Sequence, residues 1–206
     1  MKKIIYIKVA KTGGTSILNI FHDKIFKIPH YKNKNEVIDN RNIEELDFLY
    51  IPNFEWMEYY LKKNNNLFDN SIIICSIRDP VSRYISGCNH FNCDVNKLIY
   101  NLPTKEELNM WIHITQSYSE YIKNIKIDYF IRTEKLIEDI QKFCNKFKHC
   151  DSRFNIKIEN IVLNKKNYIN KITNKTIIKV TNVFKNDIKL FNNTNEINDK
   201  FLQSTI

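Results

Sequence analysis

The chain has 206 residues, of which 43% are hydrophobic, and its formal net charge is +9 at pH 7. This length supports one sizeable core but not two full domains, so we expect a single domain over residues 1–206. No apolar stretch is long enough to span a membrane and no secretory signal is evident, which predicts a cytoplasmic protein. The five cysteines lack the spacing of metal ligands, so we expect reduced thiols and no metal site.

The positive charge alone does not identify a partner. Basic residues that neutralise phosphates dominate nucleic-acid binding, but here the lysines are scattered over the whole chain. A cofactor with several negative charges or an anionic glycan also favours a basic surface. We therefore do not expect a nucleic acid as partner.

An apolar run that begins at residue 5 gives way to a short polar segment, after which apolar residues return at helical spacing. The pattern predicts a strand, a tight turn and a helix. Two consecutive glycines allow the backbone N–H groups to point inward, and the start of a helix attracts anions. The sequence therefore predicts a phosphate or sulfate site in this segment, which consists of Lys11, Thr12, Gly13, Gly14, Thr15 and Ser16.

The position of the lysine distinguishes this segment from the loop that binds ATP or GTP. The nucleotide P-loop has its lysine directly after the last glycine. Here Lys11 precedes Gly13 and Gly14, so its side chain is expected to leave from the end of the strand. This order disfavours an ordinary ATP or GTP site.

The helix after this segment is expected over residues 17–25, because apolar side chains form one stripe there. A short strand is predicted at residues 25–28, ending next to His30. Residues 31–42 are polar and predict a loop. Residues 43–63 are rich in aromatic side chains and predict irregular structure plus a helix.

A second strand-to-helix transition is predicted where the apolar residues 72–77 meet a polar turn. Arg78 is expected at the end of the strand, Asp79 at the N-cap and Pro80 at the first helical position. Three side chains of this helix are spaced to share one face: Arg83, Ser86 and His90.

Later elements follow the same alternation. Residues 105–122 have helical character, and residues 126–132 predict a strand that leads into a helix at 133–139. Residues 152–173 predict a long loop, and residues 176–191 predict a final amphipathic helix. The alternation of strands and helices indicates the α/β class.

The two polar segments together resemble motifs of the sulfotransferases that use 3′-phosphoadenosine 5′-phosphosulfate (PAPS). The carbohydrate branch, which contains the heparan sulfate 2-O- and 6-O-sulfotransferases, is the most similar. Residues 11–16 look like its 5′-phosphosulfate loop, and residues 78–86 look like its 3′-phosphate motif, in the expected order. The resemblance implies a P-loop-like fold, a three-layer α/β sandwich with a central, mostly parallel sheet.

The resemblance also implies roles for individual residues. Lys11 would contact the 5′-phosphate and the oxygen that bridges it to sulfur, where negative charge grows as the nucleotide leaves. Arg78 and Ser86 would hold the 3′-phosphate, the group that distinguishes this cofactor from ATP. Backbone amides and hydroxyls for the phosphosulfate would come from Thr12, Gly13, Gly14, Thr15 and Ser16.

Sulfuryl transfer needs a base for the proton of the acceptor hydroxyl, and the pKa of histidine suits this task. His30 is the first candidate, because it ends a predicted strand much as a catalytic histidine does in the 2-O-sulfotransferases. His90 is the second. His113 would touch the acceptor or have a structural role, and Glu55 remains open as a carboxylate base.

The resulting prediction is a sulfotransferase that moves a sulfuryl group from PAPS to a hydroxyl, with a carbohydrate favoured over tyrosyl or small-alcohol acceptors. Two other classes stay open: a P-loop kinase that uses ATP and magnesium, and a basic non-enzymatic module that binds nucleic acid or an anionic glycan. These three classes differ in the nucleotide that the protein would bind, so nucleotide selectivity discriminates them. The oligomeric state is not predicted.

Overall fold

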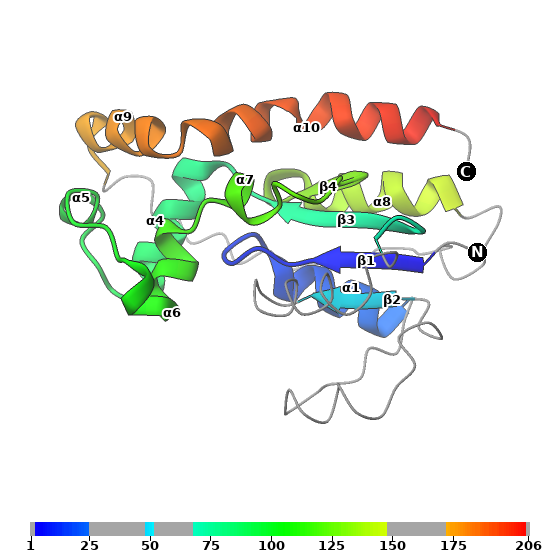
Figure 1. The fold of residues 1–206 in the computed structure, drawn as a ribbon, viewed down its shortest axis with the longest axis horizontal. Helices are drawn as coiled ribbons and strands as arrows, with labels where there is room; N and C mark the ends of the chain where they lie inside the picture. The colour runs from blue at the N-terminus through cyan, green and yellow to red at the C-terminus, as the bar shows by residue number, and fades with distance from the viewer. Residues whose placement is uncertain (1–2, 25–47, 52–67, 148–171, 205–206) are drawn as a thin grey trace.

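A computed structural model describes residues 3–24, 48–51, 68–147 and 172–204 (Figure 1). At its centre is a sheet of four strands in the order β2-β1-β3-β4, in which all described pairings are parallel. The strands are β1 Lys3–Ile7, β2 Phe48–Ile51, β3 Ser71–Ile77 and β4 Tyr129–Arg132. Parallel sheets are covered on both faces, which explains the nearly continuous apolar sequences of β1 and β3.

Helices connect the strands and surround the sheet (Figure 1). The α-helices are α1 Gly14–Lys24, α4 Pro80–His90, α5 Val95–Leu98, α6 Leu108–Met110, α7 Tyr118–Tyr121, α8 Leu136–Phe147, α9 Asn174–Val183 and α10 Lys185–Gln203. The remaining helical turns are the 3-10 turns η2 Lys105–Glu107 and η4 Thr133–Lys135 and the π-helical segment η3 Trp111–Thr115.

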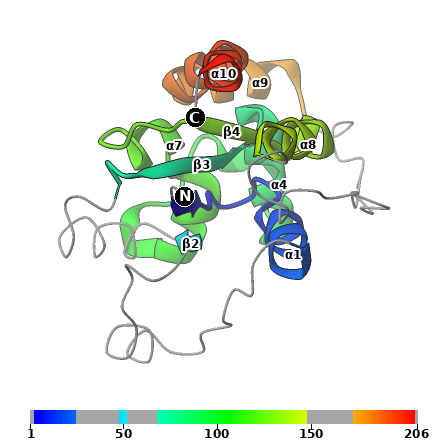
Figure 2. The same cartoon turned by 90° about the vertical axis from the view of Figure 1, so that its right-hand side faces the viewer.

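Alternate residues of the strands face two separate cores. Ile4 and Tyr6 of β1 pack with α1 and α8, whereas Ile5 and Ile7 pack with α7. Figure 2 shows α1 and α8 together on one side of the sheet and α7 on the other. This arrangement confirms the predicted α/β fold with a parallel sheet between helical layers.

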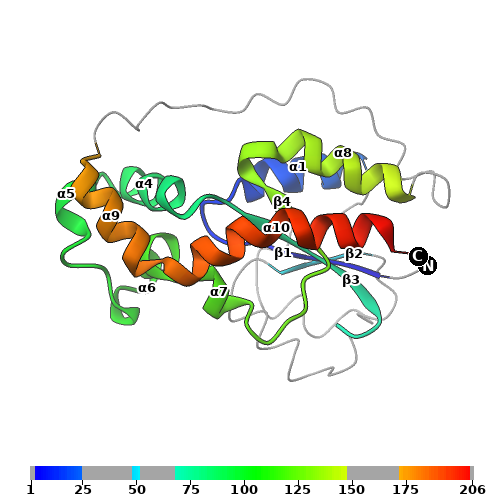
Figure 3. The ribbon, with the colours of Figure 1, turned by 90° about the horizontal axis from the view of Figure 1, so that it is seen from above.

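The C-terminal helix α10 runs along the outer side of β4 (Figure 3). Asn198 of this helix is buried, and its amide accepts a hydrogen bond from Phe130 N at 2.8 Å and donates one to Phe130 O at 2.9 Å. These are backbone groups that a strand at the end of a sheet leaves unpaired. One side chain of α10 thus satisfies them.

A buried ion pair ties the end of β4 to α8. Arg132 Nη2 lies 2.5 Å from Asp139 Oδ1, and the two side chains are only 8% and 0% exposed. Arg132 Nε and the Arg132 backbone N–H both donate to Asp139 Oδ2, at 2.8 and 2.9 Å. The hydrogen bond to Asp139 raises the pKa of Arg132.

Several local predictions are confirmed, and two need correction. The helix at 17–25 and the strand at 72–77 occur as α1 and β3. Residues 48–51 form strand β2, where irregular structure and a helix were expected. Residues 105–122 have the predicted helical character, as the contiguous turns η2, α6 and η3 over residues 105–115 and as α7 at Tyr118–Tyr121.

The second correction concerns the final helix expected at residues 176–191. It begins at Asn174 as α9, breaks at Phe184 and continues as α10 to Gln203. The predicted strand at 25–28 and most of the predicted loop at 152–173 lie outside the described residues. In the part of the chain that the structure describes, no helix is both long and apolar enough to cross a membrane.

Candidate active site

The loop between β1 and α1 contains two residues with left-handed backbone conformation, Lys11 at φ +65° and Gly13 at φ +73°. Glycine adopts this conformation freely, but a residue with a side chain carries a strain of about 1–3 kcal/mol. Such strain persists only where the surroundings hold the residue in place, and it is concentrated at functional sites. Ile17 N donates to Gly13 O at 3.2 Å, so the helix starts directly after this turn.

Close packing explains the double glycine. A Cβ atom on Gly14 would lie 2.7 Å from Cγ of Lys8, and one on Gly13 would lie 3.3 Å from Cδ1 of Leu136. The first distance is shorter than non-bonded carbon atoms allow. Glycine at position 14 therefore lets the Lys8 side chain lie against the loop.

The Thr12 side chain attaches the loop to the strands of the sheet. Its hydroxyl donates to Val9 O at 2.7 Å and lies 2.6 Å from the hydroxyl oxygen of Ser76 on β3. Since the single hydroxyl proton of Thr12 goes to Val9, Ser76 is the donor in the second bond. Thr12 is fully buried, so its hydroxyl joins β1 to β3 and does not face the anion as the sequence interpretation assumed.

The helix start in the second motif is built as predicted. Asp79 caps α4, because its Oδ1 accepts a hydrogen bond from Ser82 N at 2.8 Å, and Pro80 is the first residue of the helix. The Asp79 backbone N–H donates to Oε1 of Glu134 at 3.0 Å. Burial raises the pKa of Glu134.

Arg78 connects the second motif to the first. Its Nη1 donates to Lys11 O at 3.4 Å, and its Nε is buried without a hydrogen-bond partner among the described residues. Burial lowers the pKa of Arg78, while Glu134 and Asp79 oppose this shift. A buried N–H donor without an acceptor is costly, so an anionic ligand at this position would satisfy it.

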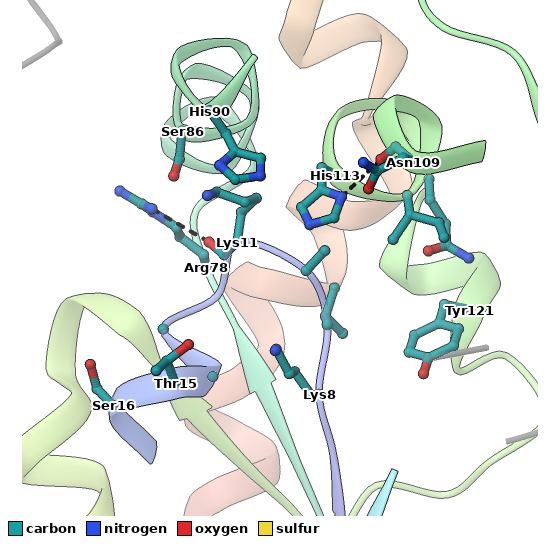
Figure 4. A pocket seen from close by; sticks show the side chains of 16 residues that line it. Lys8, Lys11, Thr15, Ser16, Arg78, Ser86, His90, Asn109, His113 and Tyr121 are labelled. Carbon is teal, nitrogen blue, oxygen red and sulfur yellow. Dashed lines mark hydrogen bonds between the residues drawn. The ribbon is translucent and has the colours of Figure 1, made fainter. Parts of the chain in front are cut away.

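Both motifs open into one cavity of about 620 Å³ (Figure 4). Its volume is in the range of sites for small molecules and cofactors. Its walls come from the β1–α1 loop, the end of β3, helix α4 and the segment from α6 to α7. It is lined by Lys8, Val9, Ala10, Lys11, Gly13, Gly14, Thr15, Ser16, Arg78, Ser86, His90, Asn109, Ile112, His113, Gln116 and Tyr121.

The cavity is electropositive. Lys8, Lys11 and Arg78 line it, whereas none of the described lining residues is an aspartate or a glutamate. Burial lowers the pKa of Lys11, and the charges of Arg78 and Lys8 lower it further. Burial also lowers the pKa of Lys8. Removing like charges from water without a counterion is unfavourable, so the cavity favours a ligand with several negative charges.

Arg83 has a different position from the one its spacing suggested. It is only 2% exposed, and it donates from Nε to Ala10 O at 3.1 Å and from Nη2 to Ile112 O at 3.2 Å. Ser86 and His90 line the cavity, but Arg83 lies behind them and holds two of its walls together. Its partners are backbone carbonyls far away in sequence, which no local pattern reveals.

Two histidines border the cavity. The rings of His90 and His113 stack with their centroids 5.2 Å apart, and His113 Nδ1 lies 2.8 Å from Asn109 O. His30, the first candidate for the base, and Glu55 lie outside the described residues, so their roles stay predictions. The sequence interpretation did not select Lys8, Asn109, Gln116 or Tyr121 as site residues.

These features fit a nucleotide that bears a phosphosulfate and a 3′-phosphate. Lys11 with the glycine loop and Arg78 with Ser86 form two separate groups of donors in one cavity. The unpartnered Nε of Arg78 is available to the second anionic group. In the described ranges, no three His, Cys, Asp or Glu side chains gather in a way that would hold a metal ion.

Comparisons with known proteins agree with this geometry. A search against protein-family models matches the sulfotransferase family over residues 1–193, a span that contains both motifs. Searches of curated proteins and of solved structures gave no match. The family match favours the predicted sulfotransferase over the kinase and the non-enzymatic binding module. The chain therefore belongs to the sulfotransferase family, whose enzymes take the sulfuryl group from PAPS.

Proposed function

We propose that this enzyme transfers the sulfuryl group to a hydroxyl of a carbohydrate, with a histidine as the base. The observation that carries the proposal is the meeting of Lys11 and Arg78, from the ends of two adjacent parallel strands, in a cavity of about 620 Å³ with no lining carboxylate among the described residues. Ligands of open α/β sheets bind at this carboxyl edge.

The two donor groups have separate tasks in this proposal. Lys11 would bind the 5′-phosphate and the bridging oxygen, assisted by Gly13, Gly14, Thr15 and Ser16. PAPS supplies the sulfuryl group and leaves as 3′,5′-adenosine bisphosphate. The Lys11 ammonium is held by a loop of fixed conformation, so it stabilises the charge that develops on the bridging oxygen without reorganising.

Arg78 and Ser86 would bind the 3′-phosphate. The Arg78 side chain is anchored at Nη1 by the Lys11 carbonyl, so its remaining N–H groups are oriented in advance. A planar guanidinium suits bidentate binding of phosphate. Recognition of this group would separate PAPS from ATP.

The carbohydrate acceptor is supported by the resemblance of residues 11–16 and 78–86 to the carbohydrate branch. The basic cavity is a second support, since Lys8 lies beside Lys11 and suits an acceptor that bears uronate or sulfate groups. Tyrosyl and small-alcohol acceptors are the competing classes.

Thermal unfolding tests the donor site first. At about 100-fold above its dissociation constant, 3′,5′-adenosine bisphosphate should stabilise the protein by about 2.7 kcal/mol, which corresponds to a rise in Tm of about 5–10 °C. The 2′,5′-bisphosphate isomer is the matched control with equal charge, and ATP with magnesium tests the kinase class. A rise in Tm with ATP and no rise with the 3′,5′ isomer would contradict the proposal.

The acceptor class is then tested with radiolabelled PAPS and a panel of heparosan, chondroitin, a tyrosine peptide and a small alcohol. Label in a polysaccharide is the expected result. Label only in the peptide or the alcohol would contradict a carbohydrate acceptor while leaving the donor site intact.

A further inference from the structure

His113 lies at a place where the backbone is fixed on several sides. It is the middle residue of the π-helical segment η3, a type of segment that often occurs at functional sites. Arg83 Nη2 binds the carbonyl of the preceding Ile112 at 3.2 Å. Gly87 of α4 lies so close that a Cβ atom there would be 2.6 Å from His113 O. The imidazole is therefore carried by a rigid wall of the cavity.

The hydrogen bond of the ring determines which nitrogen carries the proton. His113 Nδ1 lies 2.8 Å from Asn109 O, and a carbonyl oxygen only accepts hydrogen bonds. Nδ1 is therefore the donor, and the neutral ring has its lone pair on Nε2. Figure 4 shows His113 among the lining residues, with the nitrogen opposite this hydrogen bond directed toward the interior of the cavity.

Neighbouring charges favour the neutral ring. Burial lowers the pKa of His113 below its ordinary value, and the charges of His90, Lys11 and Lys8 lower it further, against the opposing effect of the Asn109 hydrogen bond. These groups come from α4, whose His90 stacks on the ring, and from the β1–α1 loop, which lines the same cavity. His113 is therefore neutral, and able to accept a proton, at neutral pH.

Aromatic contacts hold the orientation of the ring. His90 stacks on His113 with an interplanar angle of 26°, and Phe91 meets it edge-on with the centroids 5.7 Å apart. With Nδ1 bound and the ring packed against His90 and Phe91, rotation about the side-chain bonds is restricted. This is the arrangement of a base held by an orienting group.

We infer that His113 is the general base, and that its Nε2 accepts the proton of the acceptor hydroxyl. The inference rests on the proposed function. The acceptor oxygen forms a bond to sulfur as its proton moves to Nε2, and the bond between sulfur and the bridging oxygen breaks. The electron pair of that bond stays with the 5′-phosphate, next to Lys11. The proton passes from the imidazolium to solvent.

The first test needs no acceptor. Long-range 1H–15N NMR of the whole protein is expected to show His113 as the Nδ1–H tautomer, with a pKa below the ordinary value of about 6.5. Lys11→Met removes one of the neighbouring positive charges and should raise the His113 pKa. A proton on Nε2 in the neutral ring would overturn the inference.

The second test is kinetic, and it measures release of 3′,5′-adenosine bisphosphate with whichever of heparosan, chondroitin or water gives the highest wild-type rate. His113→Gln should lower kcat by about 100- to 10,000-fold while the thermal shift with the bisphosphate stays. The rate of the wild-type enzyme should fall at low pH as His113 becomes protonated. This fall is the acid limb of the pH–rate profile, and His113→Gln should lack it. Added imidazole should restore part of the activity of His113→Ala.

Two variants separate the histidines. His90→Gln should keep the acid limb but move it to higher pH, since one of the charges that lower the His113 pKa is gone. If His30→Gln lost the acid limb of the pH–rate profile and His113→Gln kept it, the base would be His30 and the inference would be overturned. A wild-type protein with neither a thermal shift nor transfer would instead overturn the proposed function itself.

Discussion

Arg78 Nη1 donates a hydrogen bond to the backbone carbonyl of Lys11 at 3.4 Å, although the two residues are 67 positions apart. The bond joins the ends of β1 and β3 and supports Lys11 in its left-handed conformation. Each motif therefore contributes to the geometry of the other, and damage to one is expected to affect both.

Arg78→Met should weaken binding of 3′,5′-adenosine bisphosphate by about 10- to 150-fold, because charged hydrogen bonds contribute about 1.5–3 kcal/mol each. Binding of 5′-AMP, which lacks the 3′-phosphate, should change much less. Isothermal titration of both nucleotides measures the difference, with Arg78→Lys as the control that keeps the charge but not the planar fork. An equal loss for both nucleotides would contradict the assignment of Arg78 to the 3′-phosphate.

Lys11 offers a test that separates stability from catalysis. Lys11→Gly relieves the strain of a side chain at φ +65°, so it should be more stable to urea than Lys11→Ala by about 1 kcal/mol or more. Both variants should lose about 100- to 1,000-fold in kcat, as expected when one preorganised donor is removed. If either variant kept the wild-type rate, Lys11 would have no role at the leaving group.

Gly87→Ala tests the close approach of α4 to the π-helical segment. Alanine is a better helix former than glycine by up to about 1 kcal/mol, but a Cβ atom 2.6 Å from His113 O forces the two backbones apart. Such overpacking costs about 1–3 kcal/mol, so we expect a lower Tm together with a lower kcat as His113 moves. A higher Tm with unchanged kcat would show that the two elements do not pack this closely.

Asp139→Asn tests the buried ion pair away from the cavity. Removing one partner leaves the Arg132 charge buried, which should cost about 3–5 kcal/mol in urea unfolding without changing nucleotide affinity. Glu138→Gln on the same helix is the control, because its ion pair with Lys142 is exposed and should matter little. Equal effects of the two substitutions would contradict a special role of the buried pair.

The sequence predicts secondary structure correctly where the conformation depends on neighbouring residues. The Asp79 cap, Pro80 at the first turn and the apolar strand β3 each depend on neighbours within a few residues. Strand β2 was missed because its four residues lie in an aromatic-rich stretch without clear alternation, and pairing with β1 determines its conformation. Tertiary pairing of this kind overrides local propensity.

At the candidate site, too, features set by neighbouring residues were predicted and features set by distant contacts were not. The two motifs that line the cavity, at residues 11–16 and 78–86, were identified from the sequence. The spacing of Arg83, however, grouped it with Ser86 and His90, and His113 was left with two possible roles. Their positions depend on the carbonyls of Ala10 and Asn109, and backbone carbonyls have no sequence signature. Within residues 105–122, whose helical character was predicted, the π-helical segment η3 carries His113 at the cavity.

The two hydrogen bonds between Asn198 and Phe130 have a consequence for association between molecules of this protein. An incoming strand would need the same N–H and C=O of Phe130 that the Asn198 amide already occupies. Helix α10 therefore closes this side of the sheet to strand addition by another molecule. Removal of α10 would expose an apolar strand edge, so a shortened chain is expected to self-associate through β4.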